Sequence, residues 1–378
     1  MVSRGVIQKR SSNITSESYR ISQNIRNENL YWLTMSEGGN CCFVAFFGVL
    51  FLFYLLISIR SEYRWFCFCF ISAFGLETLG YAARVASSND YSSTVFYALQ
   101  LACLLAAPTF IMAGIHHIFA QIVTVYGPKY SICLPRWYIC ILISTEAITF
   151  AIQCTGGILA GVSQGTSRAQ PARMIMLSGN VLQMVAMSIF FCVFLEFLWR
   201  VFFQDRKYAQ SGSDLRNMTL LNFLKMLLNV KSARTFKSDD LDCFYNHKFQ
   251  GIRTRPLLGY YPLILLLCVL LLYTRCVYRL IELAQGNSGY LHTHEVFIFT
   301  LDSALIAICG CSFVIFHPDF VFGKQNVLQT RELKEECISS EFADIQFRHT
   351  PRWPLIEDSL DSHERVKPER QVSTLYIL

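Results

Sequence analysis

The sequence has little charge for its length. Asp, Glu, Lys and Arg make up 16% of the 378 residues, whereas about 25% is usual in a soluble globular protein. Hydrophobic residues make up 53% of the chain, and Phe alone occurs 31 times. So much apolar side chain excludes a mostly disordered protein, and the length excludes a small disulfide-stapled module. A polytopic membrane protein is the class that remains.

The sequence also lacks the short motifs of common catalytic and metal sites. It has no GxxxxGK[ST] loop to cradle nucleotide phosphates and no HExxH motif. Its 15 cysteines do not form the paired CxxC pattern of a zinc site. Most of them lie in apolar segments, where they act as small apolar side chains. We therefore expect no enzymatic activity, no cofactor, no metal ion and no nucleic-acid partner.

Seven apolar segments are long enough to cross a bilayer, which takes about 20 residues of helix. They are predicted near 41–59, 65–86, 95–125, 137–159, 174–203, 261–284 and 294–316. The fold class expected is therefore an all-α membrane protein with a seven-helix bundle over 41–317. This bundle includes a basic loop over 204–260, and it lies between a polar tail over 1–40 and a polar tail, expected to be disordered, over 318–378.

Lysine and arginine indicate the orientation. The loop 204–260 has ten of them, and the connections between spans two and three and between spans six and seven have none. Basic loops stay on the cytosolic side of a membrane. We therefore predict a cytosolic loop, a cytosolic C-terminus and an extracellular N-terminus. The sequon at Asn13 (Asn-Ile-Thr) would then lie outside, where it can be glycosylated.

Four of the predicted spans carry polar stripes. Residues spaced four and seven apart share one face of a helix, and charges inside a bilayer usually face a partner or a water-filled cavity. We therefore predict that the stripes face one another inside the bundle. They consist of Glu77, Tyr81 and Arg84; Glu146 and Gln153; Arg275, Arg279 and Glu282; and Glu295 and Asp302.

Two interpretations of these stripes remain open. The charges could be ion pairs that fix helix packing, or they could line a polar cavity for the head group of an amphipathic ligand. Five acids against three arginines would suit a cationic head. The candidate binding residues are Glu77, Tyr81, Arg84, Glu146, Gln153, Arg279, Glu282, Glu295 and Asp302.

Two further features lie in spans three and four. His116 and His117 are neighbours, so their side chains point about 100° apart on a helix and cannot line one cavity well. We expect one of them to be hydrogen-bonded and the other to lie near the membrane boundary. Pro108 is predicted to kink span three, and the pair Gly156-Gly157 is predicted to end or loosen span four.

The stripe residues carry a resemblance to a known family. The run Glu77-x-x-Gly80-Tyr81-x-x-Arg84 resembles the E-x-x-G-[YF]-x-x-R motif of the fungal lipid-translocating exporter family, the RTA-like proteins. Further similar motifs are Ala107-Pro108, Gln153-x-x-Gly156-Gly157, Gly179 with Gln183, Arg279-x-x-Glu282 followed by Gly286 and Gly289, and His317-Pro318.

The resemblance covers roughly 41–318, and stretches 274–280 and 291–295 look like the sphingoid long-chain base transporter branch. Members of the family often have Asp where this chain has Glu146. The resemblance implies a seven-span plasma-membrane protein whose partners are membrane lipids and sphingoid bases or similar amphiphiles. We therefore predict transport of sphingoid bases, with resistance to toxic amphiphiles. A seven-span sensor of lipid asymmetry and a transporter of porphyrin or sterol are the alternatives.

Overall fold

Helices make up the regular structure of the part of the chain that the computed structural model describes. That part is 36–88, 93–132, 135–163, 169–206, 215, 217–286 and 289–323. All of it belongs to the first of two compact units, Met1–Cys337, and the second, Ile338–Leu378, lies outside the described residues. The sequon at Asn13 and the remainder of the C-terminal tail also lie outside them.

Seven helical segments are long and apolar enough to span a membrane, which confirms the predicted all-helical fold with seven spans. The segments are Glu37–Ser58, Arg64–Ser87, Thr94–Tyr126, Cys140–Val162, Gln170–Phe203, Leu258–Gln285 and Glu295–Val321. Their helices are α2 (Glu37–Ser58), α3 (Arg64–Ser87), α4 (Thr94–Tyr126), α5 (Pro135–Val162), α6 (Ala169–Phe203), α10 (Tyr261–Gln285), α12 (Glu295–Ile298), α13 (Ala304–Ile315) and α14 (Pro318–Val321).

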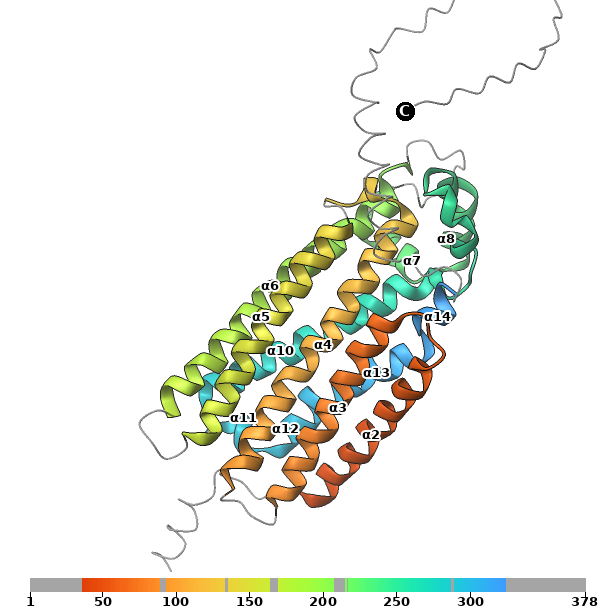
Figure 1. Ribbon diagram of the computed structural model, residues 1–378. Coiled ribbons are helices and arrows are strands. Elements are labelled where there is room, and N and C mark those ends of the chain that lie inside the picture. The colour runs from red at the N-terminus through yellow and green to blue at the C-terminus, as the bar shows by residue number, and fades with distance from the viewer. Residues whose placement is uncertain are drawn as a thin grey trace, which may run out of the picture. The chain divides into compact units, whose positions relative to one another are not determined.

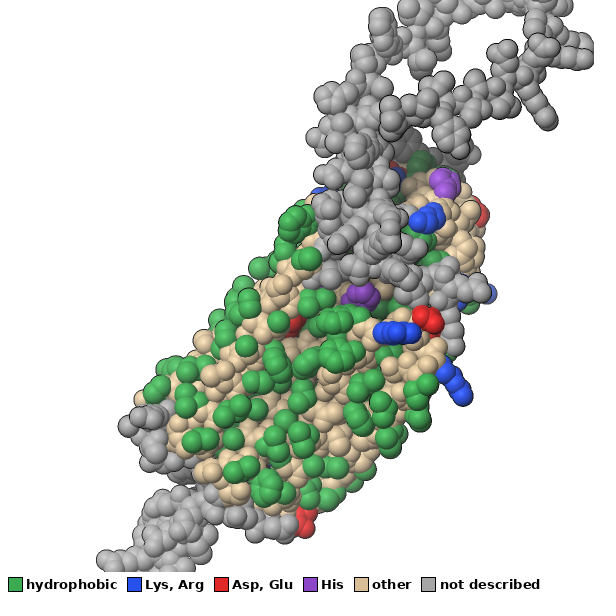
Figure 2. All heavy atoms as spheres, viewed as in Figure 1, with side chains coloured by type: hydrophobic (Ala, Val, Ile, Leu, Met, Phe, Trp, Pro, Cys, Tyr) green, Lys and Arg blue, Asp and Glu red, His purple; other side chains and the backbone are tan. Residues whose placement is uncertain are grey.

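Neighbours in the sequence are neighbours in the bundle (Figure 1). Each of the helices α2 to α6 packs against the next, α6 packs against α10, α10 against α13, and α13 against α2. Helix α4 also contacts α10 and is the most enclosed of the spans. Apolar side chains spread over the visible face of the bundle (Figure 2). A surface of this kind suits contact with lipid. The polar stripes can then face the interior of the bundle.

Two spans contain a break in the regular helical hydrogen bonding. Pro108 lies inside α4 and has no N–H, so the carbonyl of Leu104, four residues earlier, loses its helical partner. The seventh span is interrupted between α12 and α13 by a π-helical turn, Phe299–Ser303. Such turns are rare and often lie at functional sites. Both breaks lie next to buried charges.

Glycines let α5 approach the helices on both sides. A Cβ atom at Gly156 would come within 2.7 Å of the Met176 backbone nitrogen in α6, and one at Gly157 within 3.1 Å of the Ala102 nitrogen in α4. The helix does not end at this pair, as one prediction had it, but continues to Val162. The pair therefore serves as a contact point between helices, in the way that small residues do in membrane bundles.

Replacing Gly161 by alanine should separate α4 from α5. The new Cβ would lie 2.6 Å from the Cα of Ala98, and overpacking of this kind costs about 1–3 kcal/mol. We expect a lower midpoint in thermal unfolding of the purified protein in detergent. Gly38→Ala is the matched control, because no atom lies within 4 Å of its added Cβ. Equal melting of the two variants would contradict the close approach of these helices.

The segment between α6 and α10 is folded over the ends of the spans. Tyr245 donates a hydrogen bond to the Val201 carbonyl at 2.9 Å, and Arg253 donates to the Val125 carbonyl at 3.1 Å. These carbonyls lie in the last turns of α6 and α4, which helices leave without internal partners. The short elements here are α7 (Leu220–Leu227), α8 (Lys231–Phe236), α9 (Gln250–Arg253), a π turn (Lys237–Leu241) and 3-10 turns (Asp242–Phe244, His247–Phe249, Leu258–Tyr260).

The other connections hold a 3-10 turn (Pro128–Tyr130) and α11 (Tyr290–Thr293).

Candidate functional site

Asp302 is the centre of a buried ion-pair network. It lies in the π-helical turn of the seventh span and is 0% exposed. Its Oδ1 lies 2.6 Å from Nε of Arg275 and accepts a hydrogen bond from Nε of Arg279 at 3.1 Å. Arg279 also pairs through Nη2 with the second carboxylate oxygen. One carboxylate thus holds two arginines of α10, whose spacing of four puts both on the face toward the seventh span.

The network continues along α10 to Glu282. Arg279 donates through Nη1 to Oε2 of Glu282 at 2.8 Å, and Nδ1 of His292 lies 3.3 Å from the other oxygen of that carboxylate. Both acids and both arginines are at least 94% buried. Their charges balance, which is the condition under which buried ions are tolerated.

Arg275 also satisfies the carbonyl that Pro108 leaves free. Its Nη2 donates a hydrogen bond to the Leu104 carbonyl, four residues before the proline. The cation therefore connects the break in α4 with the π-helical turn that carries Asp302. This contact could not be predicted from the sequence, because a backbone acceptor has no side-chain signature.

A second cluster joins the first, second and seventh spans. Arg84 of α3 lies 2.6 Å from Oε1 of Glu295 and donates through Nε to Asn40 at 2.8 Å. Asn40 in turn donates to Glu295 at 2.9 Å, and the Ser36 backbone N–H donates to the other carboxylate oxygen at 2.7 Å. Glu295 thus accepts from three donors, and this cluster ties the start of α2 to α12.

The uncharged candidates are also paired. The Tyr81 hydroxyl hydrogen-bonds the Ser303 hydroxyl in the π-helical turn. Gln153 of α5 donates to Gln183 of α6 at 2.7 Å, on a different side of the bundle from the ion pairs. The predicted stripes of α3, α10 and the seventh span therefore meet, whereas that of α5 faces other neighbours.

Two buried carboxylates have no hydrogen-bond partner among the described residues. They are Glu77, which is 0% exposed, and Glu146, which is 3% exposed. An isolated carboxylate in an apolar environment is costly unless it is protonated or paired. These two acids are therefore the ones free to receive a proton or a cation, while Asp302, Glu282 and Glu295 are occupied.

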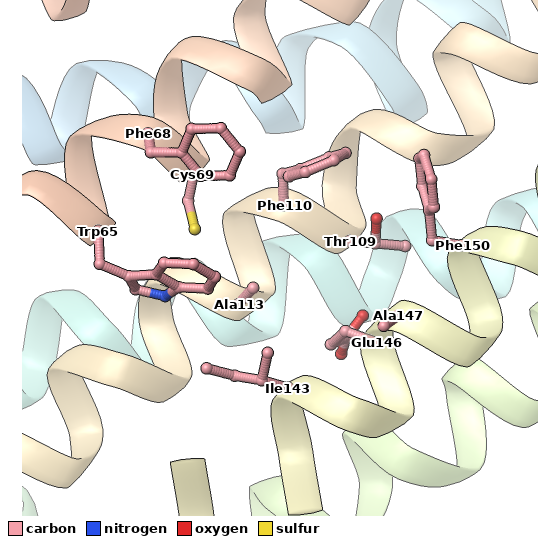
Figure 3. A pocket seen from close by; sticks show the side chains of 10 residues that line it. All are labelled: Trp65, Phe68, Cys69, Thr109, Phe110, Ala113, Ile143, Glu146, Ala147 and Phe150. Atoms are coloured by element: carbon pink, nitrogen blue, oxygen red, sulfur yellow. The ribbon is translucent and has the colours of Figure 1, made fainter. Parts of the chain in front are cut away.

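Glu146 lines a pocket of about 150 Å³ between α3, α4 and α5 (Figure 3). Four aromatic rings form a row across the three helices, with centroid separations of 5.8 Å from Trp65 to Phe68, 6.4 Å from Phe68 to Phe110 and 5.2 Å from Phe110 to Phe150. Trp65 and Phe68 are 41% and 52% exposed, so the pocket opens sideways between α3 and α5. The other lining residues are Cys69, Thr109, Ala113, Ile143 and Ala147.

Sequence reasoning found Glu146 but missed this pocket. The aromatic residues are spread over three helices and carry no charge, so nothing in their spacing distinguishes them from ordinary packing. It also left Arg275 out of the candidate list, although this residue shares Asp302 with Arg279. The spacing was the available signal: Arg275 lies four residues before Arg279, so both side chains lie on one face of the helix.

One histidine of the pair is hydrogen-bonded, as expected, whereas the other is buried and is not placed near a membrane boundary. Nε2 of His117 lies 2.9 Å from the Gln121 side chain in the same helix. The ring of His116 packs against Phe190, with centroids 4.5 Å apart, and has no hydrogen-bond partner among the described residues. Within the described part of the chain, no three His, Cys, Asp or Glu residues are grouped to hold a metal ion.

These features define a class of protein, namely a seven-span helical membrane protein with paired charges in its interior and an apolar pocket, open to the side, that has a buried acid on its lining. The chain belongs to the RTA1-like protein family, which it matches over residues 70–325. This match covers most of the second span and all of the third to seventh, and it includes every candidate binding residue.

Named relatives come from Saccharomyces cerevisiae. The sphingoid long-chain base transporter RSB1 is 32% identical over 289 residues, which are 75% of this chain and 72% of the relative. Protoporphyrin uptake protein 1 is 24% identical over 241 residues, 64% of each chain. Protein RTM1 is 22% identical over 263 residues, 69% of this chain and 70% of the relative. No solved structure matches the chain.

Proposed function

We propose that this protein transports sphingoid long-chain bases, or closely related cationic amphiphiles, across the plasma membrane. The observation that carries the proposal is Glu146, which lines a pocket that opens sideways and whose buried carboxylate has no partner among the described residues. A ligand that diffuses within the bilayer could reach such a pocket without leaving the membrane.

The chemistry of the pocket suits a molecule with an ammonium head and an alkyl chain. The ammonium group would pair with Glu146, and the row of aromatic rings would attract the same cation through the faces of their π systems. The chain would extend between α3 and α5 into lipid, beside the exposed rings of Trp65 and Phe68. An anionic or zwitterionic head would gain less from this site, because its negative group would approach the same carboxylate.

The family relationship supports this substrate class, since one relative is named a sphingoid long-chain base transporter. Another is named a protoporphyrin uptake protein, and porphyrin or sterol is therefore the alternative cargo. Glu146 favours the cationic lipid over both, because a sterol has no charge and a porphyrin carries carboxylates.

The proposed orientation places the N-terminus outside and the C-terminus in the cytosol. The ten basic residues of 204–260 support it, and with it residues 1–40 form an extracellular tail in which Asn13 is glycosylated. The tail 318–378 is then cytosolic. A glycosylation reporter fused after Leu378 should remain unmodified in cells, and a glycosylated reporter would overturn this orientation.

Reconstitution into liposomes tests transport itself. Vesicles that contain the purified full-length protein should move a fluorescent sphingoid base between leaflets faster than protein-free vesicles. Vesicles with an unrelated seven-span protein are the control for defects that any membrane protein introduces. Specific saturable binding without faster movement would contradict transport and would favour the lipid sensor.

A further inference from the structure

Glu77 is the second acid of the interior without a partner among the described residues. The lipid site proposed at Glu146 gives Glu77 no role. It lies in α3, is 0% exposed, and neither of its oxygens has a hydrogen-bond partner among the described residues. The titratable groups within electrostatic range are Tyr81 on its own helix, Cys103 of α4, Arg275 and Arg279 of α10, and Asp302 of the π-helical turn.

The charges around Glu77 are already balanced without it. Arg275 and Arg279 are paired with Asp302 and Glu282, and Arg84 is paired with Glu295. An ionised Glu77 would add one uncompensated negative charge to a dry interior, which is strongly disfavoured. The arrangement seen in the structure therefore corresponds to Glu77 in its neutral, protonated form.

We propose that Glu77 is a proton-binding site that couples lipid movement to a proton gradient, an inference that rests on the transport function proposed above. When its carboxyl O–H bond breaks, the proton passes to water on one side of the membrane and the cluster gains one negative charge. The new carboxylate then competes with Asp302 for Arg275 and Arg279. Uptake of a proton from water restores the neutral form and the observed pairing.

The position of Arg275 connects this exchange with the pocket. Arg275 holds Asp302 in the π-helical turn and also holds the Leu104 carbonyl that Pro108 leaves free. Thr109 and Phe110, which follow the proline directly, line the pocket. A change of partner at Arg275 thus acts on two helix breaks, and one of them adjoins the proposed lipid site.

The test uses purified full-length protein in liposomes and a fluorescent long-chain amphiphile with a quaternary ammonium head. The fixed charge of this probe prevents the pH gradient from driving it by simple titration. An imposed gradient of about one pH unit can support roughly tenfold accumulation for each proton exchanged. Wild-type vesicles should accumulate the probe under the gradient, and a protonophore should abolish the accumulation.

Glu77→Gln should keep exchange of probe across the membrane without a gradient but lose accumulation with one. The matched control is Glu196→Gln, because Glu196 is a half-exposed acid on α6 whose partner is Arg200. Accumulation by Glu77→Gln equal to wild type would overturn the proton site and leave transport intact. Failure of the wild-type protein to exchange the probe at all would overturn the transport function instead.

A measurement on the wild-type protein covers the case in which Glu77→Gln does not assemble. A gradient of the quaternary probe should drive protons across the vesicle membrane, as read by a pH-sensitive dye trapped inside. The proton flux should saturate with probe concentration in step with probe transport. Probe transport without any proton flux would overturn the proposal regardless of the variant.

Discussion

Glu146→Gln is expected to abolish sphingoid-base transport while the protein is made and folded at its normal level. The carboxylate has no partner within the described residues, so its removal breaks no internal ion pair. The ammonium group of the ligand, in contrast, loses its counter-charge. Loss of one member of a buried charge pair costs about 2–5 kcal/mol, which is roughly thirty-fold or more in affinity. Initial rates of sphingoid-base movement in liposomes measure the effect.

The matched variant is Glu146→Asp, which keeps the charge and shortens the side chain by one methylene. It should retain transport, because the carboxylate that pairs with the amine is kept. Thermal unfolding gives the second readout: Glu146→Gln should melt at or above the wild-type temperature, because a buried uncompensated acid is removed. Normal sphingoid-base transport by Glu146→Gln would refute the role of this carboxylate as the amine acceptor.

Asp302→Asn should have the opposite signature, with a large loss of stability. Both arginines that Asp302 holds would remain charged and buried, with Glu282 as the one remaining carboxylate in their chain of ion pairs. Removing one member of a buried ion pair costs about 3–5 kcal/mol, and here two cations lose their shared partner. We expect low abundance in the membrane and a clearly lower unfolding midpoint.

Controls separate this structural effect from a general one. Asp239→Asn changes an exposed acid outside the spans and should leave both quantities unchanged. Asp302→Glu keeps the charge and should recover part of the stability, limited by the longer side chain in a tightly packed site. If Asp302→Asn were as stable as the parent but lost transport alone, Asp302 would be a ligand-binding acid and the assignment to Glu146 would be weakened.

The sequence predicted the spans and the stripes because both follow from local patterns. Seven apolar runs are visible without any tertiary information, and spacings of four and seven place Arg275 and Arg279 on one face. The sequence also indicated that Asp302 of the seventh span faces polar residues of other spans, because charges inside a bilayer usually face a partner or a water-filled cavity.

The sequence could not predict which buried acids lack an ion-pair partner. Asp302 and Glu146 look alike as isolated acids in apolar runs, yet one holds two arginines and the other has none. That difference depends on helix rotation, on the π-helical turn and on the acceptor that Pro108 leaves at Leu104. The pocket could not be predicted for a similar reason, because its aromatic rings come from three helices and meet only when those helices pack.

A structure determined by electron cryomicroscopy with a sphingoid base bound, in a lipid nanodisc, tests the central claim most directly. We predict that the amine lies within hydrogen-bond distance of the Glu146 carboxylate and that the alkyl chain leaves the protein between α3 and α5. A head group bound instead within the Arg84–Glu295 or Asp302 network, with the aromatic pocket empty, would contradict the account.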